Sequence, residues 1–159
     1  MGEYGTVRRD EGYGVRFERV YAAAPAELWS AWTSPERIPR WLGASVTGPI
    51  EVGAAVRLVW GPEPDSQVDL VVEELVPPER LRWRWTIAGE EPSVLVVTLT
   101  PVDGGTRLVL EHTGLPPAQV AGLSAGWHDF LDVLGSGRPS GEDRWRELLP
   151  AYREQVSAL

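Results

Sequence analysis

The chain has 159 residues, of which 43% are hydrophobic and 24% charged, as is typical of one globular domain. Its formal net charge of -8 argues against binding to nucleic acid or to an anionic membrane. Because there is no cysteine, disulfides, thiol catalysis and cysteine-bound metals are excluded. No signal peptide or membrane-spanning run is recognisable, so we expect the protein to be located in the cytoplasm. We expect one domain over 1–159 and no cofactor.

The first third of the chain combines alternating and helical patterns. Alternation of apolar and polar residues predicts strands, whereas apolar residues at helical spacing after Pro25 predict a helix. Ser34 is expected to cap a second short helix, which Gly43 ends. The expected elements are two strands, 6–9 and 13–23, and two short helices, 26–33 and 35–41.

Short segments separated by proline and glycine turns fill the middle of the chain and favour hairpin-linked strands. The sharpest alternation lies in Arg80–Ile87, where Leu81, Trp83 and Trp85 share one face and arginines form the other, solvated face. Residues 103–105 are a strong hairpin signal. Including the weak segment 45–51, the candidate strands are 45–51, 54–60, 67–76, 80–87, 93–102 and 106–113.

The C-terminal quarter predicts one long helix, a glycine-rich break and a second amphipathic segment. The long helix begins near Pro117, and the break covers 135–141. The last segment, 142–159, is expected to be interrupted at Pro150. The apolar stripe of the long helix consists of Val120, Leu123, Trp127, Phe130, Leu131 and Leu134.

This order of elements predicts an α+β fold in which a curved antiparallel sheet of six or seven strands wraps around the long helix. The apolar face of such a sheet must be buried, and only the helix after Pro117 is long enough to cover it. A sheet curled around a helix leaves a wedge-shaped space, where a small ligand can bind.

Four segments together resemble one known family. They read FERVYAAAPAELWSAWTSPERIPRWL over 17–42, VPPERLRWRW over 76–85, DGGTRLVLEHTGL over 103–115 and GWHDFLDVL over 126–134. These segments resemble homologues of the activator of the 90-kDa heat-shock-protein ATPase, within the START/birch-pollen-allergen-like (SRPBCC) superfamily. The resemblance implies a helix-grip fold with its core at about 6–135, followed by an additional helix. Function varies among such relatives, so the fold does not fix the chemistry.

The resemblance also implies which residues line an apolar pocket. On the sheet these are Val56, Leu58, Trp60, Leu81, Trp83, Trp85, Leu95, Val97, Leu108, Leu110 and His112. On the long helix they are Leu123, Trp127, Phe130 and Leu134. The tryptophans among them either form plain core or line an aromatic cavity. Three more, in the short helices, either line its entrance or belong to the core: Trp29, Trp32 and Trp41.

His112 is a weak candidate for catalysis, because it is a polar group on an apolar face. It is expected either to orient a ligand or transfer protons, or to be a buried histidine bonded to backbone. His128 is expected at the surface or in contact with a loop. A metal site built from these two histidines with Glu111 and Asp129 lacks the tight spacing of known sites, so we expect no metal.

Two further patterns involve groups that serve catalysis in other proteins. Residues 122–126 match G-x-S-x-G, but the motif falls inside a helical stripe, so Ser124 is not expected to be a nucleophile. Either Glu73 or Glu74 is a candidate to face inward, and no carboxylate pair suits acid–base hydrolysis.

Three functions follow from these observations. The leading hypothesis is non-catalytic binding of a small hydrophobic molecule. The alternatives are an aromatase/cyclase-like enzyme that uses His112, and an interaction module that acts on a chaperone. The sequence leaves open whether the chain forms a homodimer, and it predicts no nucleic-acid or membrane partner.

Overall fold

The computed structural model describes residues 3–159 of the chain. Within these residues one antiparallel sheet contains eight strands. The strands are β1 (Thr6–Arg9), β2 (Tyr13–Tyr21), β3 (Ser45–Thr47), β4 (Ala55–Val59), β5 (Gln67–Val76), β6 (Arg80–Ile87), β7 (Ser93–Val102) and β8 (Gly105–Leu115). The predicted number of six or seven was too low, because the short segments β1 and β3 both pair and form the two edges of the sheet.

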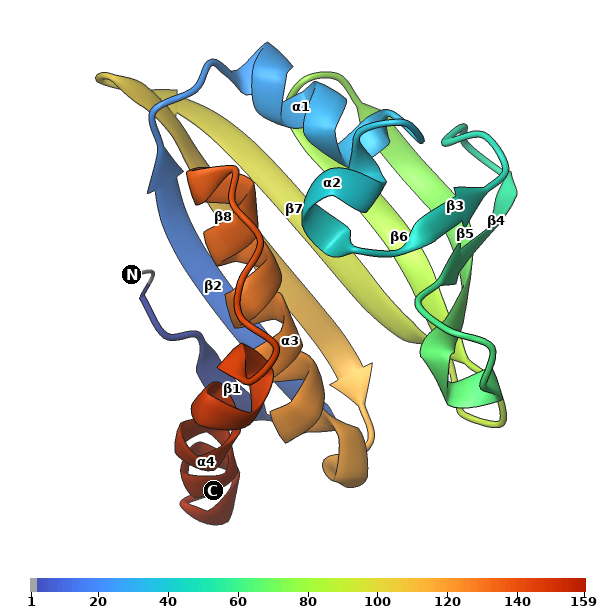
Figure 1. The fold of residues 1–159 in the computed structure, drawn as a ribbon, viewed down its shortest axis with the longest axis vertical. Helices are drawn as coiled ribbons and strands as arrows, with labels where there is room; N and C mark the ends of the chain where they lie inside the picture. The colour runs from blue at the N-terminus through green and yellow to red at the C-terminus, as the bar shows by residue number, and fades with distance from the viewer. Residues whose placement is uncertain (1–2) are drawn as a thin grey trace.

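The strands follow the order β1-β2-β8-β7-β6-β5-β4-β3, so chain neighbours pair throughout except where β2 pairs with β8. The hairpin predicted at 103–105 is confirmed, since Val102 pairs with Gly105 and Gly104 has a φ of 80°. A bulge lies between Val72 and Glu74 of β5. The sheet curves beneath the helices, which cover one of its faces (Figure 1).

Four α-helices and one 3₁₀ turn accompany the sheet in the described part of the chain: α1 (Pro25–Thr33), α2 (Ile38–Leu42), η1 (Pro64–Ser66), α3 (Pro117–Ser136) and α4 (Arg144–Ser157). The long helix α3 lies across the curved sheet, and α1 and α2 cover the sheet beside it (Figure 1). None of the helices within 3–159 has both the length and the apolar character needed to cross a membrane.

The second short helix begins later than predicted. Ser34 was expected to be its N-cap, but α2 starts at Ile38, and Arg37 occupies the cap position. The Ser34 carbonyl instead accepts hydrogen bonds from the backbone N–H groups of Arg37 and Ile38, which forms a turn before the helix. The Ser34 hydroxyl donates to Glu36, and this bond lowers the pKa of the Glu36 carboxyl.

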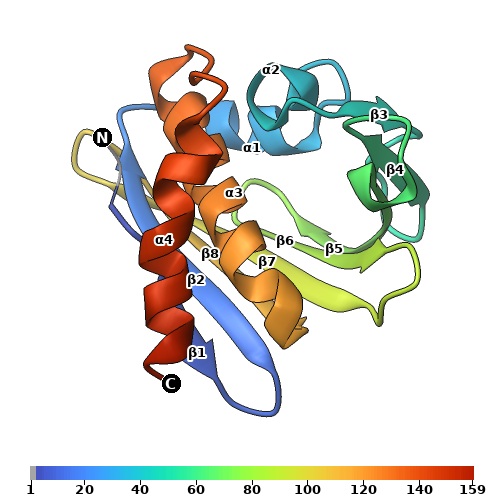
Figure 2. The ribbon, with the colours of Figure 1, turned by 60° about the horizontal axis from the view of Figure 1, so that its bottom comes forward.

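The additional C-terminal helix is continuous, so the predicted interruption at Pro150 was wrong. Proline removes one hydrogen bond of the helix, but packing against the rest of the molecule outweighs that loss. Leu148, Leu149 and Tyr152 of α4 are all buried. The helix α4 lies alongside α3 and reaches over β1 (Figure 2).

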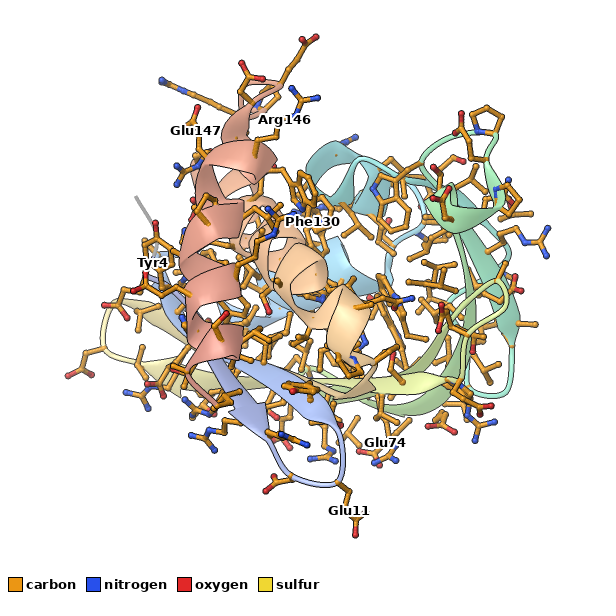
Figure 3. The ribbon with its side chains drawn as sticks, turned by 90° about the horizontal axis from the view of Figure 1, so that it is seen from below. Tyr4, Glu11, Glu74, Phe130, Arg146 and Glu147 are labelled. Carbon is orange, nitrogen blue, oxygen red and sulfur yellow. The ribbon has the colours of Figure 1, made fainter. Side chains whose placement is uncertain are left out.

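Alternation along the strands sets the two faces of the sheet. In β6, Leu81, Trp83 and Trp85 are buried, while Arg82 and Arg84 point away and pair with Glu73 of β5. Side chains fill the space between the sheet and α3 (Figure 3). The largest side chains that are fully buried include Trp32, Trp83, Trp127, Tyr152, Phe17, Ile38, Leu42, Leu58 and Leu70.

Candidate functional site

Five ring side chains from four elements meet between the sheet and α3. We call them the interior aromatic cluster: Trp32 of α1, Trp83 and Trp85 of β6, His112 of β8 and Trp127 of α3. None is more than 2% exposed. Trp83 and Trp85 are two residues apart on one strand, so they share the face that α3 covers.

The rings of this cluster are in direct contact. The centroid of Trp32 lies 5.7 Å from that of Trp83 and 5.9 Å from that of Trp127, with the latter pair stacked. Trp85 lies 5.5 Å from Trp127 and 5.3 Å from His112. These separations are typical of favourable aromatic pairs, so the cluster packs as one unit.

His112 is held by side chains on both sides of its ring. The indole N–H of Trp127 donates to Nδ1 of His112 over 3.0 Å. Because an indole nitrogen only donates, Nδ1 carries no proton, and the neutral ring bears its proton on Nε2. That nitrogen lies 2.7 Å from the Ser93 hydroxyl, which in turn donates to the Trp85 carbonyl.

Both ring nitrogens of His112 are therefore occupied, and its environment keeps it neutral. Burial lowers the pKa of His112 to about 3, because the apolar surroundings disfavour the charged ring. His112 is fully buried, in keeping with one of its two expected alternatives, but its partners are side chains and not backbone groups. Ser93 was not recognised from the sequence, since a strand pattern does not indicate which side chains form hydrogen bonds between the neighbouring strands β7 and β8.

Three indole N–H groups of the cluster have no hydrogen-bond acceptor among the described residues: those of Trp32, Trp83 and Trp85. Three other indoles of the described residues do find acceptors. Trp41, Trp60 and Trp145 donate to the carbonyls of Ala31, Leu42 and Gly122, respectively. The buried indole donors without acceptors thus all lie in one place, the space between β6, α1 and α3.

Trp60 and Phe130 form the border between the cluster and the solvent. Their rings are stacked, with centroids 6.1 Å apart and planes at 18°, and both side chains are half-buried. Trp60 also lies 6.2 Å from Trp85, and Phe130 lies 5.8 Å from Trp127. We call this pair the aromatic rim, because it is the partly exposed continuation of the interior aromatic cluster.

The other predicted pocket residues gather on the same inner side of the sheet. The buried ones are Val56, Leu58, Leu81, Leu95, Val97, Leu108 and Leu110. Leu123 and Leu134 of α3 are half-buried. Contact of any of these residues with a ligand stays a prediction. Of the three tryptophans left open, Trp32 and Trp41 are buried and belong to the core, and Trp29 is half-buried.

Two open pockets stand out at the surface, and neither is lined by the interior aromatic cluster. One, of about 990 Å³, lies beside the loop after α3 and includes Arg19, Tyr21 and Arg138. The other, of about 940 Å³, lies at the β1–β2 turn and includes Tyr13 and Glu111. Indole rings occupy the predicted wedge between sheet and helix, so a ligand there requires ring movement.

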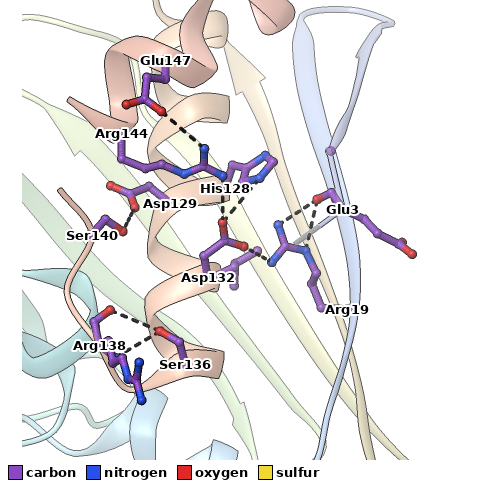
Figure 4. Close-up of polar contacts among 12 residues, drawn as sticks. Glu3, Arg19, His128, Asp129, Asp132, Ser136, Arg138, Ser140, Arg144 and Glu147 are labelled. Atoms are coloured by element: carbon purple, nitrogen blue, oxygen red, sulfur yellow. Dashed lines mark hydrogen bonds and ion pairs between the residues drawn. The ribbon is translucent and has the colours of Figure 1, made fainter. Parts of the chain in front are cut away.

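His128 was expected at the surface or in contact with a loop; it does not lie at the surface, but its ring contacts Tyr4 of the N-terminal segment. His128 is fully buried, with Nδ1 2.8 Å from the Tyr152 hydroxyl, which also accepts the backbone N–H of Gly5. Its Nε2 lies 3.6 Å from Asp132, which pairs with Arg19 and Arg144 (Figure 4). The helix α4 and the N-terminal segment cover this face of α3, which the periodicity of α3 alone does not indicate.

The remaining candidates carry no catalytic arrangement. Ser124 lies inside α3, where its hydroxyl donates to the Val120 carbonyl, as expected for a helical residue. Neither Glu73 nor Glu74 faces inward, because both pair with arginines of β6. The Asp129 carboxylate accepts a hydrogen bond from the Ser140 hydroxyl. Among residues 3–159, no three histidine or carboxylate side chains are grouped as metal ligands.

Comparisons with known proteins agree on the fold. Residues 22–136 match the family described as Activator of Hsp90 ATPase homolog 1-like protein. CalU16 from Micromonospora echinospora superposes with a TM-score of 0.76 and 26% identity, over 96% of this chain and 95% of its own. The comparison with curated protein sequences gives no match.

Two further solved structures have the same architecture. DynU16, described as a protein of the dynemicin biosynthetic locus, has a TM-score of 0.67 and 31% identity over 82% of this chain. The match spans only 50% of DynU16 itself. The Aha1 dimer from Colwellia psychrerythraea has a TM-score of 0.68 and 19% identity, over 79% of this chain and 98% of that one.

Proposed function

We propose that this chain, which belongs to the family described as Activator of Hsp90 ATPase homolog 1-like protein, binds a small, largely apolar molecule between its sheet and α3. The observation that supports the proposal is the interior aromatic cluster together with its rim. The indole rings of Trp83, Trp85 and Trp127 offer flat apolar surface between the curved sheet and α3, where the wedge-shaped space was predicted.

Entry takes place at the aromatic rim. Trp60 is held by the hydrogen bond from its indole N–H to the Leu42 carbonyl, 2.9 Å long. The ring of Phe130 has no polar atom and forms no hydrogen bond, and the side chain is half-buried. Rotation of this ring therefore costs little free energy. Movement of Phe130 uncovers Trp127, which lies directly behind it, and Trp127 is in contact with Trp85. Binding therefore proceeds by a shift of side chains, with the backbone of α3 unchanged.

The enzyme alternative has less support. An aromatase/cyclase-like reaction at this site needs His112 to give or take a proton, but both of its nitrogens are bonded within the protein. The resemblance-based alternative of a chaperone partner has no described surface that favours it. A cytoplasmic location stays a prediction. Light scattering after size-exclusion chromatography decides whether the chain forms a homodimer, which the sequence leaves open.

The test uses N-phenyl-1-naphthylamine, whose fluorescence rises in apolar surroundings. We expect saturable binding of one molecule per chain, and faster association in the Phe130→Ala variant because the rim is then open. The matched control is Trp145→Phe, which changes an exposed indole on α4 outside the site. Absence of saturable binding, or rates that do not respond to Phe130→Ala, overturns the proposal.

A further inference from the structure

The three indole donors without acceptors constrain what the interior site can bind. Trp32, Trp83 and Trp85 each bury an N–H among apolar rings. Leaving such a donor unsatisfied costs free energy, and native proteins contain few of them. Three in one cluster indicate that the site is built to meet a hydrogen-bond acceptor that the protein does not itself supply.

The polar groups already present in the cluster cannot serve as that acceptor. The only acceptor atom of the His112 ring, Nδ1, is used by Trp127. The Ser93 hydroxyl accepts from Nε2 of His112 and donates to the Trp85 carbonyl, and none of the three indole nitrogens lies within hydrogen-bond distance of its second lone pair. The cluster thus has a surplus of donors, and a bound molecule with N–H or O–H groups alone leaves that surplus unchanged.

The charge of the ligand is constrained as well. No arginine is part of the cluster, and Arg82 and Arg84 point to the opposite face of the sheet, where they pair with Glu73. A carboxylate or phosphate bound here is buried without a cation, at a large cost in free energy. The acceptor is therefore an atom without full charge.

We propose that the ligand is a flat aromatic molecule that bears a neutral carbonyl oxygen, and that this oxygen accepts hydrogen bonds from one or two of the indoles of Trp32, Trp83 and Trp85. The inference rests on the proposed function, because it names the ligand class of that same site. A carbonyl oxygen has two lone pairs, so one oxygen engages up to two of the three donors.

The experiment compares two probes of nearly the same shape, 9-fluorenone and fluorene, which differ by a carbonyl in place of a methylene. Calorimetric titration gives both affinities. We expect 9-fluorenone to bind about tenfold more tightly, the effect of hydrogen bonds to buried donors. In the ¹H–¹⁵N spectrum, the indole N–H protons of at least one of Trp32, Trp83 and Trp85 move downfield with 9-fluorenone only.

The outcomes separate the two proposals. Equal affinity of both probes, with unshifted indole signals, overturns the carbonyl inference and leaves the apolar site standing; the donors then face the surfaces of neighbouring rings. Failure of both probes to bind overturns the proposed function and the inference with it.

Single Trp→Phe variants keep an aromatic ring and remove one donor. At least one of W32F, W83F and W85F should bring the affinity ratio of the two probes toward unity, while Trp145→Phe leaves the ratio as it is. An unchanged ratio in all three variants contradicts the inference. The affinity for fluorene in each variant reports whether the site is intact, and where it is lost the indole spectrum of the unmodified protein decides.

Discussion

The indole N–H of Trp127 on α3 donates to Nδ1 of His112 on β8 over 3.0 Å, and this bond fastens the long helix to the sheet. Nε2 of the same His112 ring forms a hydrogen bond with the Ser93 hydroxyl on β7. His112 is thus a positioning residue of the interior site. It sets the distance between α3 and Trp85 of the sheet. The ring centroids of His112 and Trp85 are 5.3 Å apart.

The first prediction concerns the loss of this histidine. In His112→Leu, the Trp127 N–H and the Ser93 hydroxyl both lose a buried partner, so we expect the free energy of unfolding to fall by about 2–4 kcal/mol. Urea denaturation measures it. The double variant with Trp127→Phe removes one orphaned donor and should show coupling of about 1 kcal/mol between the two sites. Strict additivity would contradict the assigned hydrogen bond.

The second prediction is a pH dependence of stability. The pKa of His112 is about 3 in the folded protein against the ordinary 6.5, so the unfolded chain binds more protons between these values. Stability due to His112 is complete above pH 6.5 and is lost as the pH falls, with a slope of about 1.4 kcal/mol per pH unit. Urea denaturation between pH 5 and 6.5 avoids the titration range of carboxylates. His112→Leu should flatten the slope, and an unchanged slope contradicts the account.

The third prediction concerns the Tyr152 hydroxyl. It accepts the Gly5 N–H and lies 2.8 Å from Nδ1 of His128, so it joins α4 to the N-terminal segment and to α3. Tyr152→Phe should cost about 1–3 kcal/mol of stability and speed hydrogen exchange at the Gly5 amide. The matched control, Tyr4→Phe, changes a half-exposed ring and should leave both quantities as they were. Slow exchange in Tyr152→Phe would show that another group holds the segment.

The fourth prediction concerns the proline inside α4. Pro150→Ala restores a backbone N–H in a helix that is already continuous, so it should raise the free energy of unfolding by about 1–2 kcal/mol. The gain is smaller than the full penalty of a helical proline, because proline also restricts the unfolded chain. The control is Pro139→Ala in the loop before α4, which gains no helical bond. A loss of stability in Pro150→Ala would mean that the helix depends on its proline.

Much of the fold followed from alternation along the chain. In β6 the apolar positions Leu81, Trp83 and Trp85 turn inward and the arginines outward, as predicted, because a strand exposes its faces with a period of two. The helical stripe with Trp127 faces the sheet for a similar reason. These local periods do not depend on distant parts of the chain.

The predictions from sequence were wrong where segments far away along the chain determine the surroundings of a residue. His128 is buried because α4 and the N-terminal segment cover its side of α3, and Pro150 is tolerated because Leu149 and Tyr152 anchor the helix around it. The three indoles without acceptors were equally beyond prediction, since hydrogen-bond satisfaction depends on where Trp32 of α1 meets β6 in space.

The central claim is that a small molecule binds between the sheet and α3, and isotope-filtered NMR tests it most directly. With ¹³C-labelled protein and unlabelled fluorene, we expect intermolecular NOEs from fluorene to ring protons of Trp85, Trp127 and Phe130. NOEs confined to the surface pockets, for example to Tyr13 or Tyr21, would contradict the account and place binding elsewhere on the molecule.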